Sequence, residues 1–262
     1  MEVGGSDVNN LVLTVRPGVE VRGQIVLDST QKNVDLTKLR VNLVAADDPT
    51  GGAISQLTSV IAALPAAQGR GNNNGANGAR GQALNGLLAG QLQGGVVAAD
   101  GTFTLTNVNA FEYRIRVTGL PAGFFLKSGQ IGTADALNIP FTVSEQPDTL
   151  QLRIGTSTGR VSGIVVDAKG MPASGVLTAL VPDPSRRGRT DMYFSANSGA
   201  DGKFNFTNVP PGSYKLFSWE EIPSGAYQYP DFIRNFEDRG QAITVEPDGS
   251  LEQEIRAIPA SN

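Results

Sequence analysis

A nine-residue stretch occurs twice in this chain, and it constrains the fold more than any other feature. Asp100–Val108 reads Asp-Gly-Thr-Phe-Thr-Leu-Thr-Asn-Val, and Asp201–Val209 reads Asp-Gly-Lys-Phe-Asn-Phe-Thr-Asn-Val. A tyrosine follows each copy after five residues, at Tyr113 and Tyr214. Such internal similarity indicates two copies of one structural module. In each copy Asp-Gly is typical of a turn, and the alternating apolar residues after it are typical of a strand with one buried face.

Other segments repeat with the same spacing. Val21–Asp28 parallels Val161–Asp167, and the alternating segment Leu150–Ile154 returns as Leu251–Ile255. Because Leu150–Ile154 leads into the second module, we interpret it as a strand that closes one module before the next begins. Leu11–Val15 has the same pattern, which predicts that the chain is the C-terminal portion of a longer tandem array. The alternative is that residues 11–15 complete a sheet of the first module or of a neighbouring chain.

The composition favours an all-β protein with two domains. The chain has 262 residues, 18% of them charged, with 32 glycines and 15 prolines that mark many turns between short elements. Short strands at regular spacing with turn signals between them are typical of a β-sandwich. We expect tandem Ig-like sandwiches over residues 1–147 and 148–262.

The first module carries an insertion at about residues 50–95 relative to the second. Its centre, at residues 69–81, consists almost entirely of glycine, asparagine, alanine and arginine. Such a segment buries too little apolar surface to offset the entropy of ordering, so we expect Gln68–Gln82 to form a flexible loop tip. The flanking segments Ser55–Leu64 and Ala83–Leu92 are rich in alanine and leucine, which favours short helical turns.

The charge pattern argues against nucleic acid as a partner. The net charge is −4, whereas phosphate binding needs a concentrated basic face. One basic cluster occurs, at Arg186, Arg187 and Arg189. We expect a solvated loop there, and the alternative is a site for small anions or acidic sugars.

Missing residue types exclude several chemistries. There is no cysteine and no histidine, which removes disulfides, thiol catalysis, the commonest general base and the usual zinc ligand. The sequence also lacks a phosphate-binding GxxxxGK[ST] loop. We therefore expect no enzymatic activity, no cofactor and no metal. No apolar run approaches the ~20 residues that span a bilayer, so we expect no direct membrane insertion.

Two motifs of the second module resemble the carboxypeptidase regulatory-like domain. They are Gly163–Val176, with Gly-x-Val-Val-Asp-x-x-Gly-x-Pro, and Asp201–Leu216, with Asp-Gly-x-Phe-x-Phe-x-x-Val-Pro-Pro-Gly-x-Tyr-x-Leu. The first module is a looser match, because Asn109–Glu112 replaces the Pro-Pro-Gly-Ser segment. The resemblance implies two transthyretin-like sandwiches that serve as accessory pieces of larger proteins. The segment Trp219–Phe232 resembles long envelope proteins of soil bacteria, which implies a cell-envelope or extracellular location as part of a longer precursor.

An aromatic-rich segment after the second repeat is the best candidate for ligand binding. Trp219, Tyr227 and Tyr229 could stack on sugar rings, and Glu220 could accept hydrogen bonds from hydroxyl groups. The alternative is that these rings fill a small core beneath a long loop. Residues 231–238 after Pro230 predict a short helix.

The sequence therefore favours a structural, assembly or adhesion role, with carbohydrate binding as the alternative. The apolar side chains of Leu11, Leu13 and Val15 could complete a neighbour's sheet by strand addition. The expected partners are a second copy of the chain, another envelope protein or a polysaccharide.

Overall fold

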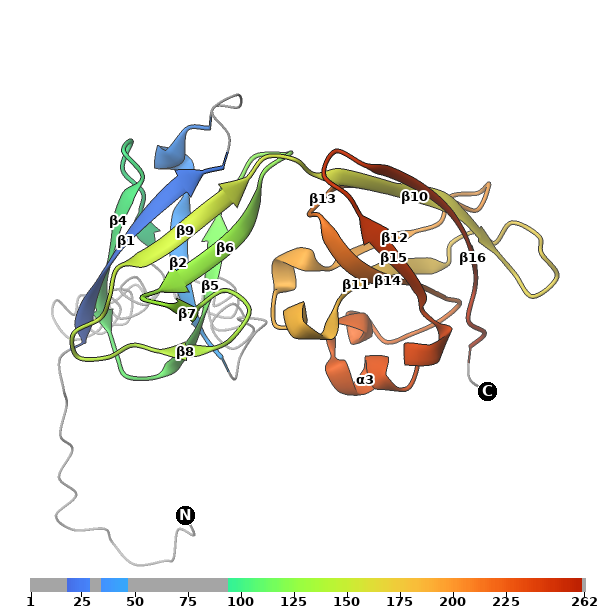
Figure 1. The fold of residues 1–262 in the computed structure, drawn as a ribbon. Coiled ribbons are helices and arrows are strands. Elements are labelled where there is room, and N and C mark those ends of the chain that lie inside the picture. The colour runs from blue at the N-terminus through green and yellow to red at the C-terminus, as the bar shows by residue number, and fades with distance from the viewer. Residues whose placement is uncertain (1–17, 29–33, 47–93, 261–262) are drawn as a thin grey trace, which may run out of the picture.

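Two β-sandwiches lie side by side in the computed structural model, which describes residues 18–28, 34–46 and 94–260 (Figure 1). The expected all-β class and tandem sandwich arrangement are confirmed. The predicted strand Leu11–Val15 and the insertion as far as residue 93 lie outside the described residues.

The first sandwich pairs a five-stranded sheet with a four-stranded sheet in the described part of the chain. The sheet orders are β4-β1-β9-β6-β7 and β3-β2-β5-β8. The strands are β1 (Val19–Leu27), β2 (Arg40–Ala45), β3 (Gly95–Val96), β4 (Thr102–Val108), β5 (Glu112–Thr118), β6 (Phe125–Ile131), β7 (Ala134–Asp135), β8 (Phe141–Thr142) and β9 (Leu150–Gly155).

The second sandwich pairs a three-stranded sheet with a four-stranded sheet over residues 159–256. The sheet orders are β13-β10-β16 and β12-β11-β14-β15. The strands are β10 (Gly159–Val166), β11 (Leu177–Pro182), β12 (Phe194–Asn197), β13 (Lys203–Val209), β14 (Gly212–Trp219), β15 (Gln241–Val245) and β16 (Ser250–Arg256).

Short helical segments occupy the loops. The helix predicted over residues 231–238 is shorter than expected. Its α-helical part ends at Arg234, and a separate 3₁₀ turn begins at Glu237. The segments are α3 (Pro230–Arg234) and the 3₁₀ turns η1 (Leu36–Lys38), η2 (Pro184–Arg186), η3 (Thr190–Met192), η4 (Ala226–Gln228) and η5 (Glu237–Arg239).

The repeated stretch forms the same structure twice. Its copies are β4 and β13, and each pairs antiparallel with the first strand of its own sandwich. Val21 lies opposite Leu105 in the first, and Val161 lies opposite Phe206 in the second. A bulge interrupts both pairings just before Val21 and Val161. The sequence repeat is therefore a repeat of strand register.

Two asparagines at equivalent positions share an uncommon backbone conformation. Asn107 and Asn208 near the ends of β4 and β13 both have φ of 59°. Asparagine tolerates this left-handed region better than other side-chain-bearing residues, because its short amide can bond locally. The conserved Thr-Asn-Val ending of the two copies thus encodes one turn geometry.

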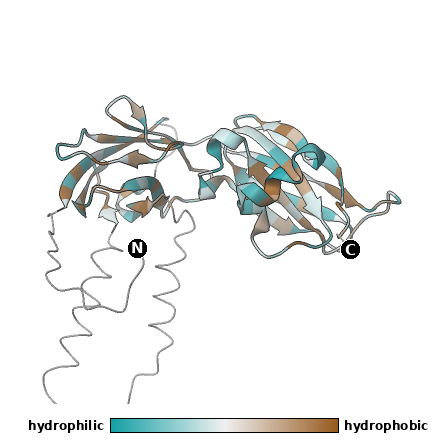
Figure 2. Ribbon diagram, turned by 90° about the horizontal axis from the view of Figure 1, so that it is seen from below, coloured by the Kyte–Doolittle hydropathy of each residue, from teal (hydrophilic) through white to brown (hydrophobic). Residues whose placement is uncertain are grey.

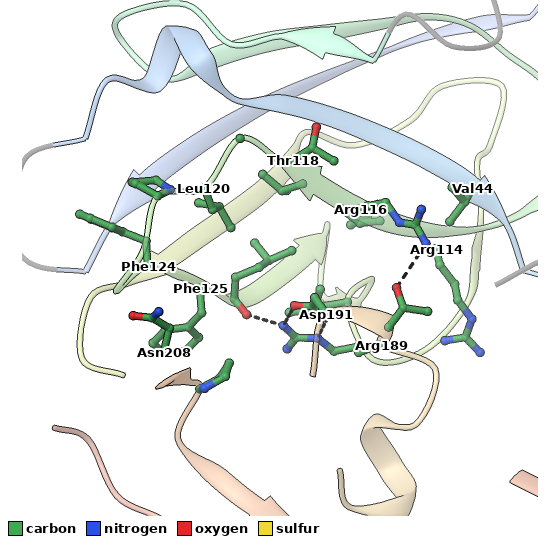
Figure 3. Close-up of a pocket in the computed structure, with 18 of the residues that line it drawn as sticks. Val44, Arg114, Arg116, Thr118, Leu120, Phe124, Phe125, Arg189, Asp191 and Asn208 are labelled. Atoms are coloured by element: carbon green, nitrogen blue, oxygen red, sulfur yellow. Dashed lines mark hydrogen bonds and ion pairs between the residues drawn. The ribbon is translucent and has the colours of Figure 1, made fainter. Parts of the chain in front are cut away.

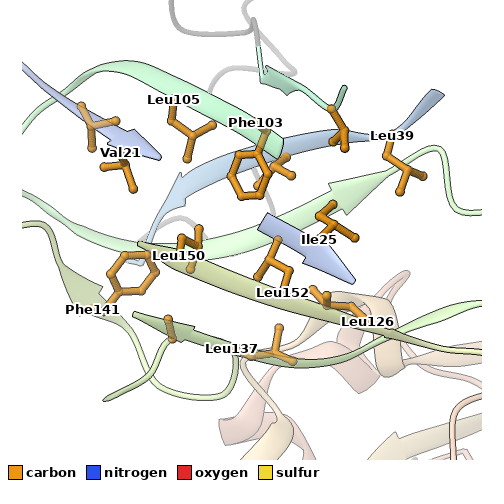
Figure 4. Packing of buried hydrophobic residues seen from close by; sticks show 14 of the residues in the cluster. Val21, Ile25, Leu39, Phe103, Leu105, Leu126, Leu137, Phe141, Leu150 and Leu152 are labelled. Atoms are coloured by element: carbon orange, nitrogen blue, oxygen red, sulfur yellow. The ribbon is translucent and has the colours of Figure 1, made fainter. Parts of the chain in front are cut away.

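The alternating residues of the strands fill the space between the sheets. In Figure 2 hydrophobic and hydrophilic positions alternate along the strands. Figure 4 shows Phe103 and Leu105 of β4 in the first core together with Ile25 and Leu152, which come from β1 and β9 of the same sheet. In the second core Phe204 and Phe206 lie 5.5 Å apart between ring centroids. Burial of these alternating faces is the dominant favourable term for folding.

In the second copy, the repeated tyrosine anchors the turn that precedes its strand. The Tyr214 hydroxyl donates to the carbonyl of Pro210, four residues upstream, at 2.8 Å. Burial raises the pKa of both phenols, Tyr113 and Tyr214. Tyr214 therefore ties the entry of β14 to its own loop.

The strand β9 joins the two sandwiches. It pairs parallel with β1 and antiparallel with β6, although the expected domain division between residues 147 and 148 assigns it to the second domain. In the second sandwich β16 pairs parallel with β10 in the equivalent way. No described strand of the second sandwich corresponds to β6 or β7.

We predict that Tyr214→Phe destabilises the second sandwich. The substitution leaves the buried carbonyl of Pro210 without its donor, which costs about 1–3 kcal/mol of unfolding free energy. Urea denaturation measures the loss. Tyr229→Phe is the matched control, because that ring is 56% exposed. Equal denaturation midpoints for the two variants would contradict the anchoring role.

Candidate functional site

The aromatic side chains after the second repeat form a packed cluster. The rings of Phe217 and Trp219, near the end of β14, are stacked with centroids 5.0 Å apart and an interplanar angle of 10°. Phe236 meets the indole edge-on at 5.8 Å, and Phe232 lies at 6.1 Å. The loop that carries α3 thus covers the indole with aromatic carbon.

The four predicted ligand residues lie in different environments. Trp219 is 1% exposed, whereas Tyr229 is 56% exposed. Tyr227 is half-buried and shares a 2.9 Å hydrogen bond with Ser195, while the exposed Glu220 accepts from the backbone N–H of Ala260. Because the faces of the indole are covered, its burial favours the packing alternative over sugar stacking.

The basic cluster differs from the expected solvated loop. Arg187 forms an ion pair with Glu237 and its side chain is only 12% exposed. Lys215 of β14 contacts the same carboxylate at 2.8 Å. Hydrogen bonding from Arg187 holds the pKa of Glu237 below its ordinary value, against the opposing effect of burial, and Lys215 adds to the lowering. A carboxylate distant in sequence therefore draws the loop onto the sandwich.

Arg189 is buried between the two sandwiches. Its guanidinium group donates to the backbone carbonyl of Leu126 on β6 at 2.6 Å. It also forms a two-point ion pair with Asp191, at 2.6 and 3.2 Å. The expectation of a solvated side chain is wrong here, because the neighbouring module and Asp191 replace water around the charge.

A cleft with a volume of about 570 Å³ adjoins this contact. One wall comes from β5 and the segment that leads into β6, and the other from the loop around η3. Figure 3 shows Arg114, Arg116 and Arg189 toward one end and Leu120 and Phe124 toward the other. The cleft thus combines guanidinium groups with an apolar wall, which are features of small-molecule sites.

Arg114 and Arg116 were not identified by sequence reasoning. In β5 the alternating residues Tyr113, Ile115 and Val117 pack on the first core, so the two arginines project from the opposite face. On a single sandwich that face meets water. The available sequence signal was the pair of arginines at outward positions of one strand. It does not reveal that they line a cleft, because the neighbouring Gly188 comes from the second module.

Other site predictions have no counterpart in the described structure. The proposed assembly residues Leu11, Leu13 and Val15 lie outside the described residues. Over residues 18–28, 34–46 and 94–260 no group of three or more acidic, cysteine or histidine side chains is arranged to hold a metal. In the same ranges no helix has the length and hydrophobicity to cross a bilayer.

Comparison with known proteins gives structural neighbours of low similarity. No protein-family model and no curated protein matches the sequence. The minor pilin GBS52 of Streptococcus agalactiae is 14% identical with a TM-score of 0.35, over 92% of this chain and 98% of that one. A streptococcal ancillary pilin is 13% identical with a TM-score of 0.31, and the match covers 90% of this chain and 62% of that one. The Bacillus anthracis TIE protein is 11% identical with a TM-score of 0.29, and the match covers 92% of this chain and 34% of that one.

Glu237→Gln is expected to alter the pH dependence of stability. A carboxylate whose folded pKa is lowered stabilises the fold above its unfolded pKa of about 4.3, and this stabilisation is lost as the pH falls through the folded value. The variant should therefore have a lower free energy of unfolding than the wild type at pH 7. Between about pH 5 and about pH 2, within roughly two units of that pKa, it should lose less of this free energy than the wild type.

Denaturation midpoints over that range measure the effect. Glu254→Gln, on the exposed face of β16, is the control and should follow the wild type. A Glu237→Gln curve parallel to the wild-type curve would contradict the role of the Arg187–Glu237–Lys215 cluster.

Proposed function

We propose that this chain is a non-catalytic β-sandwich module of a bacterial cell-envelope or extracellular protein, with a structural, assembly or adhesion role. The observation that carries the proposal is the polar contact between the sandwiches. A spacer or adhesion stalk must hold its modules in a defined orientation, and the buried Arg189 supplies one directional contact to the carbonyl of Leu126.

The connection between the sandwiches also supports a fixed orientation. Only residues 156–158 separate β9 from β10, and Thr156 within them is buried. The ring of Phe125 lies against Gly155 so closely that a Cβ atom there would collide with it. Interfaces between domains of one chain permit relative motion unless specific contacts oppose it. Here the Arg189–Leu126 bond is one such contact, and it lies beside a short linker.

We propose that the domain boundary lies at this linker, in place of the division between residues 147 and 148. The pairing of β9 with β1 supports the change. We further propose that the second sandwich belongs to the carboxypeptidase regulatory-like family. Its three-stranded and four-stranded sheets, together with the motifs at Gly163–Val176 and Asp201–Leu216, support this assignment.

Assembly by strand addition is the proposed mode of self-association. β6 covers the outer edge of β9 in the first sandwich, whereas no described strand covers the equivalent edge of β16. An open strand edge presents unpaired N–H and C=O groups to another chain. We propose that Leu11–Val15 of a second copy occupies this edge, with Leu11, Leu13 and Val15 continuing the apolar face.

Arg189→Ala should loosen the docking of the two sandwiches. We expect a loss of about 1–3 kcal/mol of docking free energy, less than for a fully buried pair because the Asp191 side chain is 49% exposed. Small-angle X-ray scattering should show a larger radius of gyration. Arg160→Ala, at an exposed position of β10, is the control. Identical scattering of both variants would contradict a fixed orientation.

The assembly proposal predicts that the intact chain forms oligomers or filaments that disappear when residues 1–16 are deleted. Leu13→Asp should act like the deletion, because a charge on the apolar face opposes burial. Thr14→Asp, on the other face of the alternating segment, should leave assembly intact. Light scattering with negative-stain imaging of the same samples measures both. An intact chain that remains monomeric would overturn strand addition.

A further inference from the structure

A recess lies on the outer face of the second sandwich, where the sheet meets the loop that follows β14. Its volume is about 350 Å³, which lies within the usual range of ligand pockets, about 300–1,000 Å³. Two of the four ligand residues predicted from the sequence, Tyr227 and Glu220, line this recess, whereas Trp219 does not. The strands β11 and β12 supply the opposite wall.

Strand pairing places the lining side chains around one small space. In the register of the sheet, Leu177 of β11 lies between Asn197 of β12 and Trp219 of β14. Glu220 directly follows Trp219, and Ser195 lies two residues before Asn197 on the same face of β12. Neighbouring strands lie about 4.8 Å apart, so Asn197 and the start of the loop at Glu220 are roughly 10 Å apart. One small molecule can therefore contact both walls.

Apolar surface and hydroxyl groups occur side by side in the recess. Leu177 and Tyr227 are half-buried. The Tyr227 ring is held by Tyr193, with the ring centroids 6.5 Å apart, and its hydroxyl shares a 2.9 Å hydrogen bond with the hydroxyl of Ser195. Because one of these two hydroxyls donates to the other, one hydroxyl hydrogen is left to donate to a ligand. The C–H face of a sugar ring can pack beside such a pair.

The groups on the loop side are negatively charged and accessible. Glu220 and Glu221 are both exposed. Glu220 uses Oε2 to accept from the backbone N–H of Ala260 at 3.3 Å, whereas no hydrogen bond or ion pair engages the Glu221 side chain within the described part of the chain. The described residues that line the recess include no lysine or arginine. Two adjacent carboxylates repel each other, and a cation beside them relieves the repulsion.

We propose that this recess binds an amino sugar, with its ammonium group on Glu221, its ring on Leu177 and Tyr227, and a hydroxyl group on the side-chain amide of Asn197. Hydrogen bonds from an ammonium group to a carboxylate are charge-assisted and about twice as strong as neutral ones. The amide of Asn197 both donates and accepts, as a sugar hydroxyl does. The ligand joins β12 to the loop after β14, which adds a binding activity to the structural role.

Nitrogen-15 NMR spectra of the full chain at about pH 6 test this proposal, because at that pH an amine is protonated and glutamate is ionised. The probes are glucosamine, glucose, which lacks the amine, and cyclohexylamine, which lacks the hydroxyl groups. We expect glucosamine to cause saturable shifts of the Asn197 side-chain amide and of the backbone N–H signals of Glu221 and Ser224. Its affinity should exceed that of either other probe about tenfold, because each lacks part of the hydrogen bonding.

Variants at exposed positions separate the two parts of the site. Glu221→Gln should lower the affinity for glucosamine about tenfold, the loss expected for one charged hydrogen bond, and leave the affinity for glucose unchanged. Glu252→Gln, at an exposed position of β16, is the matched control and should bind as the wild type does. The wild-type chain needs no variant to be decisive. Absence of shifts with glucosamine, or equal affinity for glucose or for cyclohexylamine, would overturn the proposal.

Discussion

The arrangement of the two sandwiches depends on the burial of the Arg189 guanidinium group. Removing a charged group from water is unfavourable unless partners replace the hydration. Asp191 neutralises the charge, and the carbonyl of Leu126 accepts one of its hydrogen bonds from the other module. That requirement fixes which part of β6 meets the loop around η3. The cleft beside it, with Arg114 and its glycine neighbour, exists only in this docked arrangement.

The fold itself could be predicted largely from local pattern. Alternating apolar residues identified β13 and β16 close to their observed bounds, because every second side chain of a half-buried strand must face the core. Lys203, which is out of phase with the buried Phe204 and Phe206, is exposed, as this alternation requires. The repeated tyrosine was visible as a pattern, but the bond of Tyr214 to the carbonyl of Pro210 was not.

Long-range pairing was less accessible to sequence reasoning. In the sequence repeat, Leu152 of the first closing segment corresponds to Gln253 of the second. In the structure Ile25 pairs with Leu152, and the equivalent residue Val165 pairs with Ile255. The structural correspondence is therefore shifted by two residues from the sequence repeat. A shift of two preserves the buried face, so the hydrophobic pattern cannot detect it.

Partners supplied from distant parts of the chain explain the other differences. Arg187 and Arg189 read as solvated residues because their partners, Glu237 and the carbonyl of Leu126, are supplied by other parts of the fold. For Trp219 the sequence left open a ligand ring or a packed ring, because the loop that covers it is defined only by tertiary packing.

The parallel pairing of first and last strands has a mechanical consequence. In the second sandwich β10 and β16 lie side by side from the Arg160–Ser250 pair to the Val166–Arg256 pair, and in the first sandwich β1 and β9 are related in the same way. Tension along the chain pulls the start of one strand against the end of its neighbour. The force therefore acts as shear on all the hydrogen bonds of the pair together, instead of opening them one after another. A chain built this way resists extension at each module, while β9 passes the load directly into β10.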